Sequence, residues 1–156
     1  MQKVLDFRDW RDKQGVYCIK NTANGKVYVG SAAYVYDGQR TARSLHIRLR
    51  DHVYALDRHQ HANVHLQRAW DKYGKDSFEF YVLQEVSSGG DLLESEQTWI
   101  DQLKSADPQY GYNICKTAGS SLGRKHSPET KEKLRLLSTG RKHTPETRAK
   151  IGRAHV

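Results

Sequence analysis

The sequence has few cysteines, and this shortage narrows the kinds of site it can hold. Cys18 and Cys115 are the only two among 156 residues. They do not form a CxxC pair, so a zinc site built on cysteines is not expected. We expect both to be thiols in a reducing compartment, packed as small hydrophobic side chains.

Long apolar segments are also missing. Mean hydropathy is −0.85, and no apolar run approaches the length that spans a membrane. The first 14 residues are charged and lack the apolar core of a signal peptide. The sequence therefore predicts a cytosolic protein with no membrane partner.

Positive charge is concentrated at the C-terminal end. Residues 1–115 contain 15 Lys and Arg and 15 Asp and Glu, so their charges cancel. Residues 116–156 contain 11 Lys and Arg and 3 Asp and Glu, an excess of 11 − 3 = +8. A neutral body with a basic arm indicates a polyanionic partner, most often nucleic acid. The alternative is a basic tail that only keeps the chain soluble.

The order of hydrophobic patterns predicts an α+β (α/β) fold, with a small three-stranded, mainly antiparallel sheet flanked by three helices. A hairpin is expected from residues 15–20 and 26–31, and a third strand over 77–86. Helices are expected over 42–57, 62–73 and 91–104, and a short extended segment over 110–114 closes the domain. We therefore divide the chain into residues 1–116 and 117–156.

The hairpin carries two tyrosines at informative positions. Asn24-Gly25 is a strong two-residue turn signal because both residues tolerate positive φ. Such a turn would place Asn21 opposite Tyr28. Because side chains alternate between faces, Tyr17, Tyr28 and Gly30 would then share one face of the hairpin.

The basic tail is built from a repeat. Residues 123–131 (GRKHSPETK) recur as residues 140–148 (GRKHTPETR), a period of 17 residues, and the chain ends inside the second unit. Ser127 or Thr144 would cap a helix, and Pro128 or Pro145 would take its first position. The helices are too short to be stable alone, so we expect them to order on DNA.

Glu96 is the most informative anomaly. In the helix predicted over 91–104, the apolar stripe consists of Leu92, Leu93, Trp99, Ile100 and Leu103. Glu96 falls within this stripe, whereas Glu94 points away from it. An inward carboxylate is costly unless it is paired or binds a metal. Helix geometry alone leaves a metal site, a buried ion pair and a partly exposed side chain all open.

Arg48 and His52 share a face of the first predicted helix, since they are four residues apart. Arg48 could clamp a phosphate or form a surface ion pair. For His52 the sequence alone favours a surface side chain over a proton shuttle. His59, His61 and His65 do not have the spacing of a dedicated zinc site.

Taken together, these residues resemble the GIY-YIG nuclease family. Gly15-Val16-Tyr17 and Tyr28-Val29-Gly30, separated by ten residues, are similar to its two signature triplets, with valine for isoleucine in each. The resemblance covers roughly residues 13–116 and is closest to phage and intron-encoded homing endonucleases. The further residues that match the family's functional positions are Arg48, His52, His61, Glu96 and Asn113.

The resemblance implies hydrolysis of a DNA phosphodiester. Glu96 would hold one divalent ion, Mg²⁺ or Mn²⁺, and Arg48 would stabilise the phosphate. Tyr17 would be the general base, with His52 as its relay, and Tyr28 would orient water or phosphate, although these two phenols could exchange roles. Gly15 would be structural, Gly30 would let the DNA backbone approach, Asn113 would brace the site, and His61 would be auxiliary.

The tail resembles a nuclease-associated modular DNA-binding motif of such homing enzymes. It implies double-stranded DNA as the partner, held by a protein that is monomeric or pairs transiently on DNA. The tail residues expected to contact DNA are Arg124, Lys125, His126, Lys131, Arg141, Lys142, His143, Arg148 and Lys150. A repair or structure-specific nuclease and a catalytically inactive DNA-binding protein are the alternatives.

Overall fold

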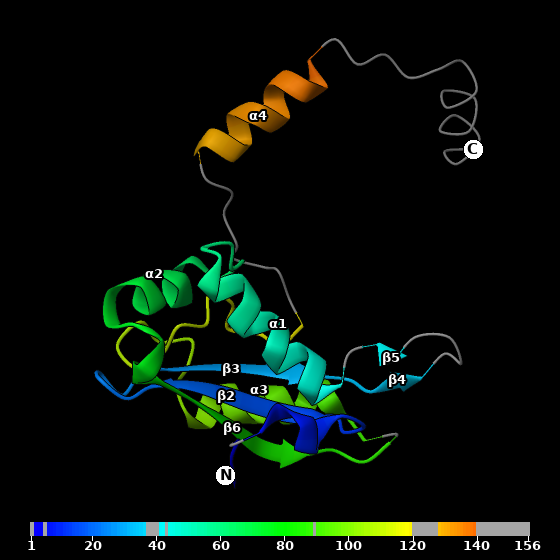
Figure 1. Ribbon diagram of the computed structural model, residues 1–156. Coiled ribbons are helices and arrows are strands. Elements are labelled where there is room, and N and C mark those ends of the chain that lie inside the picture. Colours follow the sequence, from blue (N-terminus) through cyan, green and yellow to red (C-terminus); the bar gives the residue numbers. More distant parts are fainter. Residues whose placement is uncertain are drawn as a thin grey trace, which may run out of the picture. The chain divides into compact units, whose positions relative to one another are not determined.

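The computed structural model describes residues 2–4, 6–36, 41–42, 44–88, 90–119 and 128–139. The chain forms two compact units, Met1–Gly123 and Arg124–Val156 (Figure 1). In the described part of the chain, no helix combines the length and apolar character needed to cross a bilayer.

The first unit contains a four-stranded antiparallel sheet in the order β1-β6-β2-β3. Its strands are β1 (Gln2–Lys3), β2 (Gly15–Asn21), β3 (Val27–Ala32) and β6 (Phe78–Glu85). A separate ribbon pairs β4 (Val35–Tyr36) with β5 (Thr41–Ala42). The α+β class is confirmed, but the prediction of three strands was wrong. The strands that it missed have two residues each, too few to show a period.

The β2–β3 hairpin has a longer loop than predicted. Tyr17 pairs with Gly30 and Ile19 with Tyr28, and the loop closes where the Asn21 N–H donates to the carbonyl of Lys26 at 2.9 Å. Only Gly25 in this loop has a positive φ, 75°, so the two-residue turn was wrong and the register shifts by two residues. A shift of two keeps each side chain on its face, and Tyr17, Tyr28 and Gly30 still share one.

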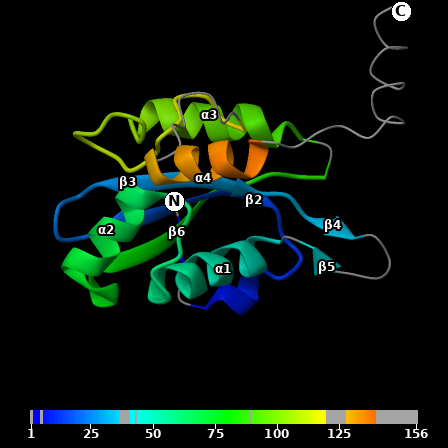
Figure 2. The same cartoon turned by 90° about the horizontal axis from the view of Figure 1, so that it is seen from above.

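Three helices cover the sheet, with α1 (Leu45–Asp57) and α2 (Val64–Tyr73) on one face and α3 (Leu92–Gln102) on the other (Figures 1 and 2). Two short 3₁₀ helices, η1 (Phe7–Trp10) and η2 (Lys75–Ser77), complete the unit. The α1 helix begins at Leu45, three residues later than predicted, and Ser44 occupies the N-cap position without a side-chain capping hydrogen bond. Asn63 caps α2, and Gly74 ends it as expected.

The sheet separates two apolar cores. One lies under α1 and α2 and includes Tyr17, Leu49 and Trp70; the other lies under α3 and includes Cys18 and Ile100. Cys18 and Cys115 are both free thiols. In α3 the predicted stripe was wrong at one position, because Leu93 is exposed at 55%.

The described part of the second unit is one helix, α4 (Pro128–Ser138). Pro128 occupies its first turn, as the repeat predicts, and Glu132 pairs with Arg135 at 2.7 Å. Lys131 is exposed on this helix. The capping residues Ser127 and Thr144 and the helix expected after Pro145 lie outside the described residues.

Candidate active site

Tyr17 lies at the centre of the site, at the point where Gly30 makes room for it. Tyr17 is fully buried on the face of β2 that carries α1. A Cβ atom at Gly30 would lie 2.5 Å from the Tyr17 hydroxyl and 3.2 Å from a ring carbon of Tyr28. The space left by the missing side chain is therefore occupied by the tyrosine itself. The expectation that Gly30 lets the DNA backbone approach stays a prediction.

Tyr28 stands beside Tyr17 on the edge strand β3. The two ring centroids are 6.5 Å apart, and the Tyr28 ring also meets the rings of His52 and His61 edge-on. Unlike Tyr17, Tyr28 is only partly buried. The two phenols thus differ in their access to solvent.

The α1 helix directs Arg48 and His52 toward the Tyr17 hydroxyl. His52 Nε2 lies 2.5 Å from the Tyr17 oxygen, and Arg48 Nε donates to that oxygen at 3.3 Å. His52 is 4% exposed, so the surface position favoured by the sequence alone was wrong. Arg48 remains exposed and so can reach a phosphate that binds from solvent.

His61 lies in the loop between α1 and α2, and it contacts the nitrogen of the His52 ring that does not contact Tyr17. Its Nε2 is 2.7 Å from His52 Nδ1. The other two histidines of this segment are elsewhere: His59 pairs with Asp71 at 2.8 Å, and His65 is exposed on α2. His61 is therefore the one of the three that joins the tyrosine site.

Glu96 reaches the site from α3, on the opposite face of the sheet. The Ser31 hydroxyl donates to Glu96 Oε2 at 2.6 Å, which fixes the carboxylate beside β3. Its negative charge acts on both Tyr17 and Tyr28 and raises their pKa values. Glu96 is half-buried, so the partly exposed side chain left open by helix geometry describes it, and the buried ion pair does not.

Asn113 braces the edge of β3. Its Oδ1 accepts from the Val29 N–H at 2.8 Å, and its Nδ2 donates to the Val29 carbonyl at 2.8 Å. The side-chain amide therefore replaces a neighbouring strand for this residue. The predicted extended segment 110–114 contains one parallel bridge, Gly111 to Val27. Position 111 in this segment has no room for a side chain, because a Cβ atom at Gly111 would lie 2.0 Å from the Ser105 carbonyl oxygen.

Gly15 is structural, as the resemblance implies. A Cβ atom there would lie 2.2 Å from the carbonyl oxygen of Gln84. The β2–β6 register shifts between Val16 and Tyr17. Gly15 therefore permits the close backbone approach next to this irregularity, two residues before Tyr17.

Burial keeps the central groups neutral at pH 7. Burial raises the pKa of Tyr17 well above its usual value, and the neighbouring Tyr28 raises it further, against the opposing effect of Arg48. Burial also raises the pKa of Tyr28. The pKa of His52 is lowered well below 6.5 by burial first, then by Arg48 and His61. Burial likewise lowers the pKa of His61.

Comparison with known families identifies this arrangement. The family described as the GIY-YIG catalytic domain matches residues 13–113. The chain belongs to the GIY-YIG catalytic domain family. A second family, the NUMOD3 motif, matches residues 122–136 and 140–156, which include both repeat units. The resemblance inferred from the sequence is thereby confirmed.

Two curated relatives extend the match. Intron-associated endonuclease 1 of Enterobacteria phage T4 is 38% identical over 104 residues, and probable intron-encoded endonuclease 1 of Neurospora crassa is 30% identical over 130 residues. These alignments cover 66% and 80% of this chain but only 37% of each relative. The chain thus spans little more than a third of the relatives it matches.

Solved structures of one nuclease domain share the GIY-YIG fold seen here. A structure titled as the catalytic domain of homing endonuclease I-TevI has a TM-score of 0.52 and 36% identity, over 66% of this chain and 99% of that one. A mutant of the same catalytic domain gives a TM-score of 0.54 and 35% identity, over 69% and 99%.

Five of the residues predicted for the GIY-YIG site gather around the two phenols: Tyr17, Tyr28, Arg48, His52 and His61. Asn113 braces the backbone of β3, and Glu96 acts electrostatically on Tyr28. The sequence analysis missed three residues that hold the site residues in place. Ser31 binds Glu96, and Asn63 and Gln67 bind His61. These polar contacts belong to no recognisable sequence motif. The tail residues Arg124, Lys125, His126, Arg141, Lys142, His143, Arg148 and Lys150 lie outside the described residues.

Proposed function

We propose that this protein is a metal-dependent DNA endonuclease of the intron-encoded homing type, acting in the cytosol of a host cell. One observation carries the proposal: two phenols and a guanidinium come together on β2, β3 and α1, and the Glu96 carboxylate of α3, held by Ser31 of β3, acts electrostatically on both phenols. A phosphodiester bound there would find a cationic clamp, an acid–base group and a metal ligand within one site.

The donor set at Glu96 suits Mg²⁺ or Mn²⁺. Glu96 Oε2 is held by Ser31, and its Oε1 has no hydrogen-bond partner in the described part of the chain. The described residues contain no cluster of three or more His, Cys, Asp or Glu side chains that could hold a metal ion. A single carboxylate fits a hard cation that keeps most of its waters. When bound, the ion would stabilise charge on the phosphate oxygens and the leaving group.

Arg48 is the phosphate clamp in this scheme. Its Nε is engaged by Tyr17, the guanidinium also forms a hydrogen bond with Tyr28, and the side chain as a whole remains exposed to solvent. A planar guanidinium suits phosphate oxygens, and its charge opposes the extra negative charge of the pentavalent transition state. Arg48 would therefore bind the transition state more tightly than the ground state.

Burial favours Tyr28 over Tyr17 as the general base. The base must touch the attacking water, and Tyr17 is fully buried whereas Tyr28 is partly exposed. Tyr28 is neutral at pH 7, so the base is its ionised form, a minor population there; this form takes a proton from the water, whose oxygen bonds to phosphorus. The bond from phosphorus to the 3′ oxygen breaks, and that oxygen keeps the electron pair and takes a proton from solvent. Tyr28 thus takes the role of general base that the resemblance gave first to Tyr17, an exchange that the resemblance left open.

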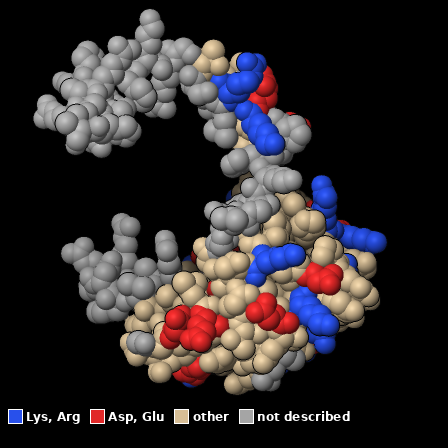
Figure 3. Space-filling model, turned by 180° about the vertical axis from the view of Figure 1, so that it is seen from behind, with Lys and Arg blue, Asp and Glu red and all other residues tan. Residues whose placement is uncertain are grey.

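The basic tail would supply affinity for double-stranded DNA. Its repeats match the NUMOD3 motif, and Lys131 is exposed on α4. Both signs of charge are visible on the face of the first unit in Figure 3, in keeping with its balanced composition. Electrostatic attraction to the DNA backbone would therefore come mainly from the tail.

Supercoiled plasmid tests the proposal directly. The full chain with Mg²⁺ should convert supercoiled plasmid to the nicked form, leaving 5′-phosphate and 3′-hydroxyl ends, and EDTA should stop the reaction. Plain duplex should be cut at least as well as flaps and junctions, because a homing enzyme acts on intact duplex. Protein that binds the plasmid but leaves it intact with Mg²⁺ and with Mn²⁺ would show a DNA-binding protein instead.

A further inference from the structure

The loop between α1 and α2 carries a chain of hydrogen bonds that leads to the tyrosines. The Asn63 backbone N–H donates to His61 Nδ1 at 3.0 Å. His61 Nε2 is 2.7 Å from His52 Nδ1, and His52 Nε2 is 2.5 Å from the Tyr17 hydroxyl. The loop, α1 and β2 are thus linked by three consecutive contacts.

The first of these contacts determines the direction of the others. A backbone N–H can only donate, and a neutral imidazole has one N–H and one accepting nitrogen. His61 Nδ1 must therefore accept, which places the His61 proton on Nε2. That proton is donated to His52 Nδ1, so the His52 proton must in turn lie on Nε2 and point at the Tyr17 oxygen. A weaker alternative, His61 Nδ1 to the Asn63 carbonyl, is longer at 3.3 Å.

We propose that His61 is a positioning residue, which with the Asn63 amide holds His52 in the tautomer that donates to Tyr17. The inference rests on the proposed nuclease function for its catalytic meaning. It assigns His52 the role of hydrogen-bond donor, in place of the proton relay that the family resemblance implies. Burial lowers the pKa of both histidines, so both are neutral at pH 7 and the tautomer argument applies.

The consequence falls on Tyr28. The Tyr17 oxygen accepts from His52 Nε2 and from Arg48 Nε, so its own proton is free to be donated elsewhere. A hydrogen bond with Tyr17 lowers the pKa of Tyr28, in opposition to burial, as expected when Tyr17 is the donor. Each link of the chain therefore stabilises the ionised form of the phenol that faces solvent.

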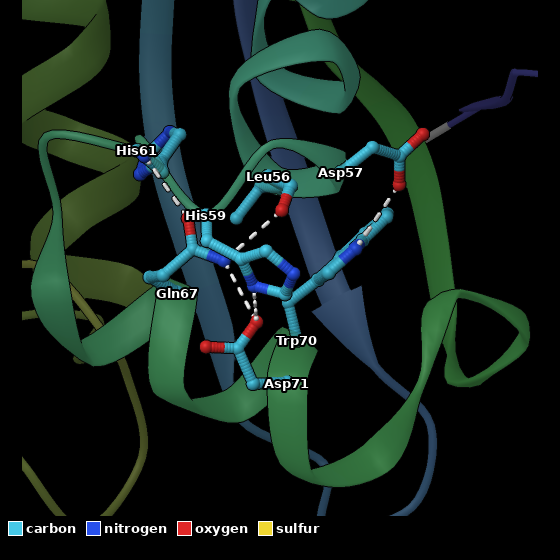
Figure 4. Close-up of polar contacts among 7 residues, drawn as sticks. All are labelled: Leu56, Asp57, His59, His61, Gln67, Trp70 and Asp71. Carbon is cyan, nitrogen blue, oxygen red and sulfur yellow. Dashed lines mark hydrogen bonds and ion pairs between the residues drawn. The ribbon is translucent and has the colours of Figure 1, made fainter.

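The loop that holds His61 is itself fixed by a second network (Figure 4). The His61 N–H donates to Gln67 Oε1 at 3.0 Å, and Gln67 Nε2 donates to the carbonyl of Leu56 and to Asp71. Asp71 also pairs with His59. Gln67 is nearly buried, at 9% exposure. These contacts tie the loop to the end of α1 and to α2, so the backbone of His61 has a defined position.

Nitrogen-15 NMR measures the tautomers directly. Long-range ¹H–¹⁵N correlation spectra of the full chain at about pH 7.5 distinguish a proton on Nε2 from one on Nδ1, with exposed His65 as the reference. We expect Nε2–H for both His52 and His61. A proton on Nδ1 of either ring would overturn the proposal, and it would do so without bearing on whether the protein cuts DNA.

A pair of variants tests the catalytic consequence. The groups that face Tyr28 are Tyr17, Arg48, His52, His61 and Glu96. Because the reacting phenol must be ionised, nicking with Mg²⁺ should accelerate as pH rises. His61→Leu removes the N–H donor and should lower the rate about tenfold near neutrality and move the rise to higher pH.

His61→Gln keeps an N–H donor near the position of Nε2 and should restore most of the rate. His65→Leu makes the same change on an exposed histidine and should leave the pH profile unchanged. If His61→Leu and His61→Gln lose activity equally with no shift in the pH profile, His61 has only a structural role and the proposal fails.

Discussion

At the scale of single residues, Gly30 decides whether the two phenols can coexist. A Cβ atom there would be only 2.5 Å from the Tyr17 hydroxyl, and the buried Tyr17 cannot move without disturbing His52 and Arg48. Gly30→Ala should destabilise the fold by about 1–3 kcal/mol and reduce nicking by at least about tenfold. Urea unfolding and plasmid nicking measure the two effects. An alanine variant with full activity would show that the hydroxyl position does not matter.

The neutral histidines predict how stability depends on pH. His52 faces Tyr17, Tyr28, Arg48 and His61, and its pKa in the fold is well below 6.5. Below pH 6.5 the unfolded chain therefore binds a proton that the fold excludes. Stability should be complete above 6.5 and fall as pH drops toward the folded-state pKa.

Urea unfolding at about pH 7.5 and about pH 5.5 measures this dependence. His52→Gln removes the titrating ring, so the loss of stability between the two pH values should be smaller in this variant than in the wild type. His65→Gln, on an exposed site, is the matched control and should lose as much as the wild type. Equal pH dependence in all three proteins would contradict the neutral, buried state of His52.

At the scale of elements, Asn113 determines whether the edge of β3 is closed. It accepts from and donates to the backbone of Val29. Asn113→Ala would leave both backbone groups without that partner and should cost about 1–3 kcal/mol of unfolding free energy. Asn113→Asp keeps the acceptor for the Val29 N–H and should lose less in urea unfolding. Equal stability of alanine and wild-type protein would exclude the bracing role.

Sequence patterns predicted the main elements because their signals are local. The face shared by Tyr17 and Tyr28 followed from the alternation of side chains in a hairpin, and it survived a register that was wrong by two residues. Glu96 was recognised from its place in an apolar stripe. By contrast, the burial of His52 depends on Tyr17 and His61, which come from other elements, and the packing of Gly30 against Tyr17 depends on the strand register. Such contacts have no signature in a single sequence.

At the scale of the whole molecule, the structure shows where the tail can be removed. Gln97 on α3 binds the carbonyl of Lys116 and the N–H of Ala118, so a cut before these residues would damage the first unit. A chain ending at Gly119 keeps these contacts. It should retain the unfolding transition of the first unit but bind DNA more weakly.

The salt dependence of DNA binding measures the contribution of the tail. Each lost phosphate contact should reduce the slope of log affinity against log salt concentration by about 0.9, so the shortened chain should show a flatter line. The full chain under the same conditions is the control. An unchanged slope would place the DNA-binding charge in residues 1–119 instead.

The most direct test of the central claim compares two glutamates on α3. Glu96 is held beside β3 by Ser31, whereas Glu94 is exposed on the same helix. Nicking rates of the full chain should be measured against Mg²⁺ concentration for the wild type, Glu96→Gln and Glu94→Gln. The account predicts that Glu96→Gln loses Mg²⁺-dependent nicking while still binding DNA, and that Glu94→Gln behaves as the wild type. A Glu96→Gln protein that nicks at the wild-type rate with the same Mg²⁺ dependence would contradict it.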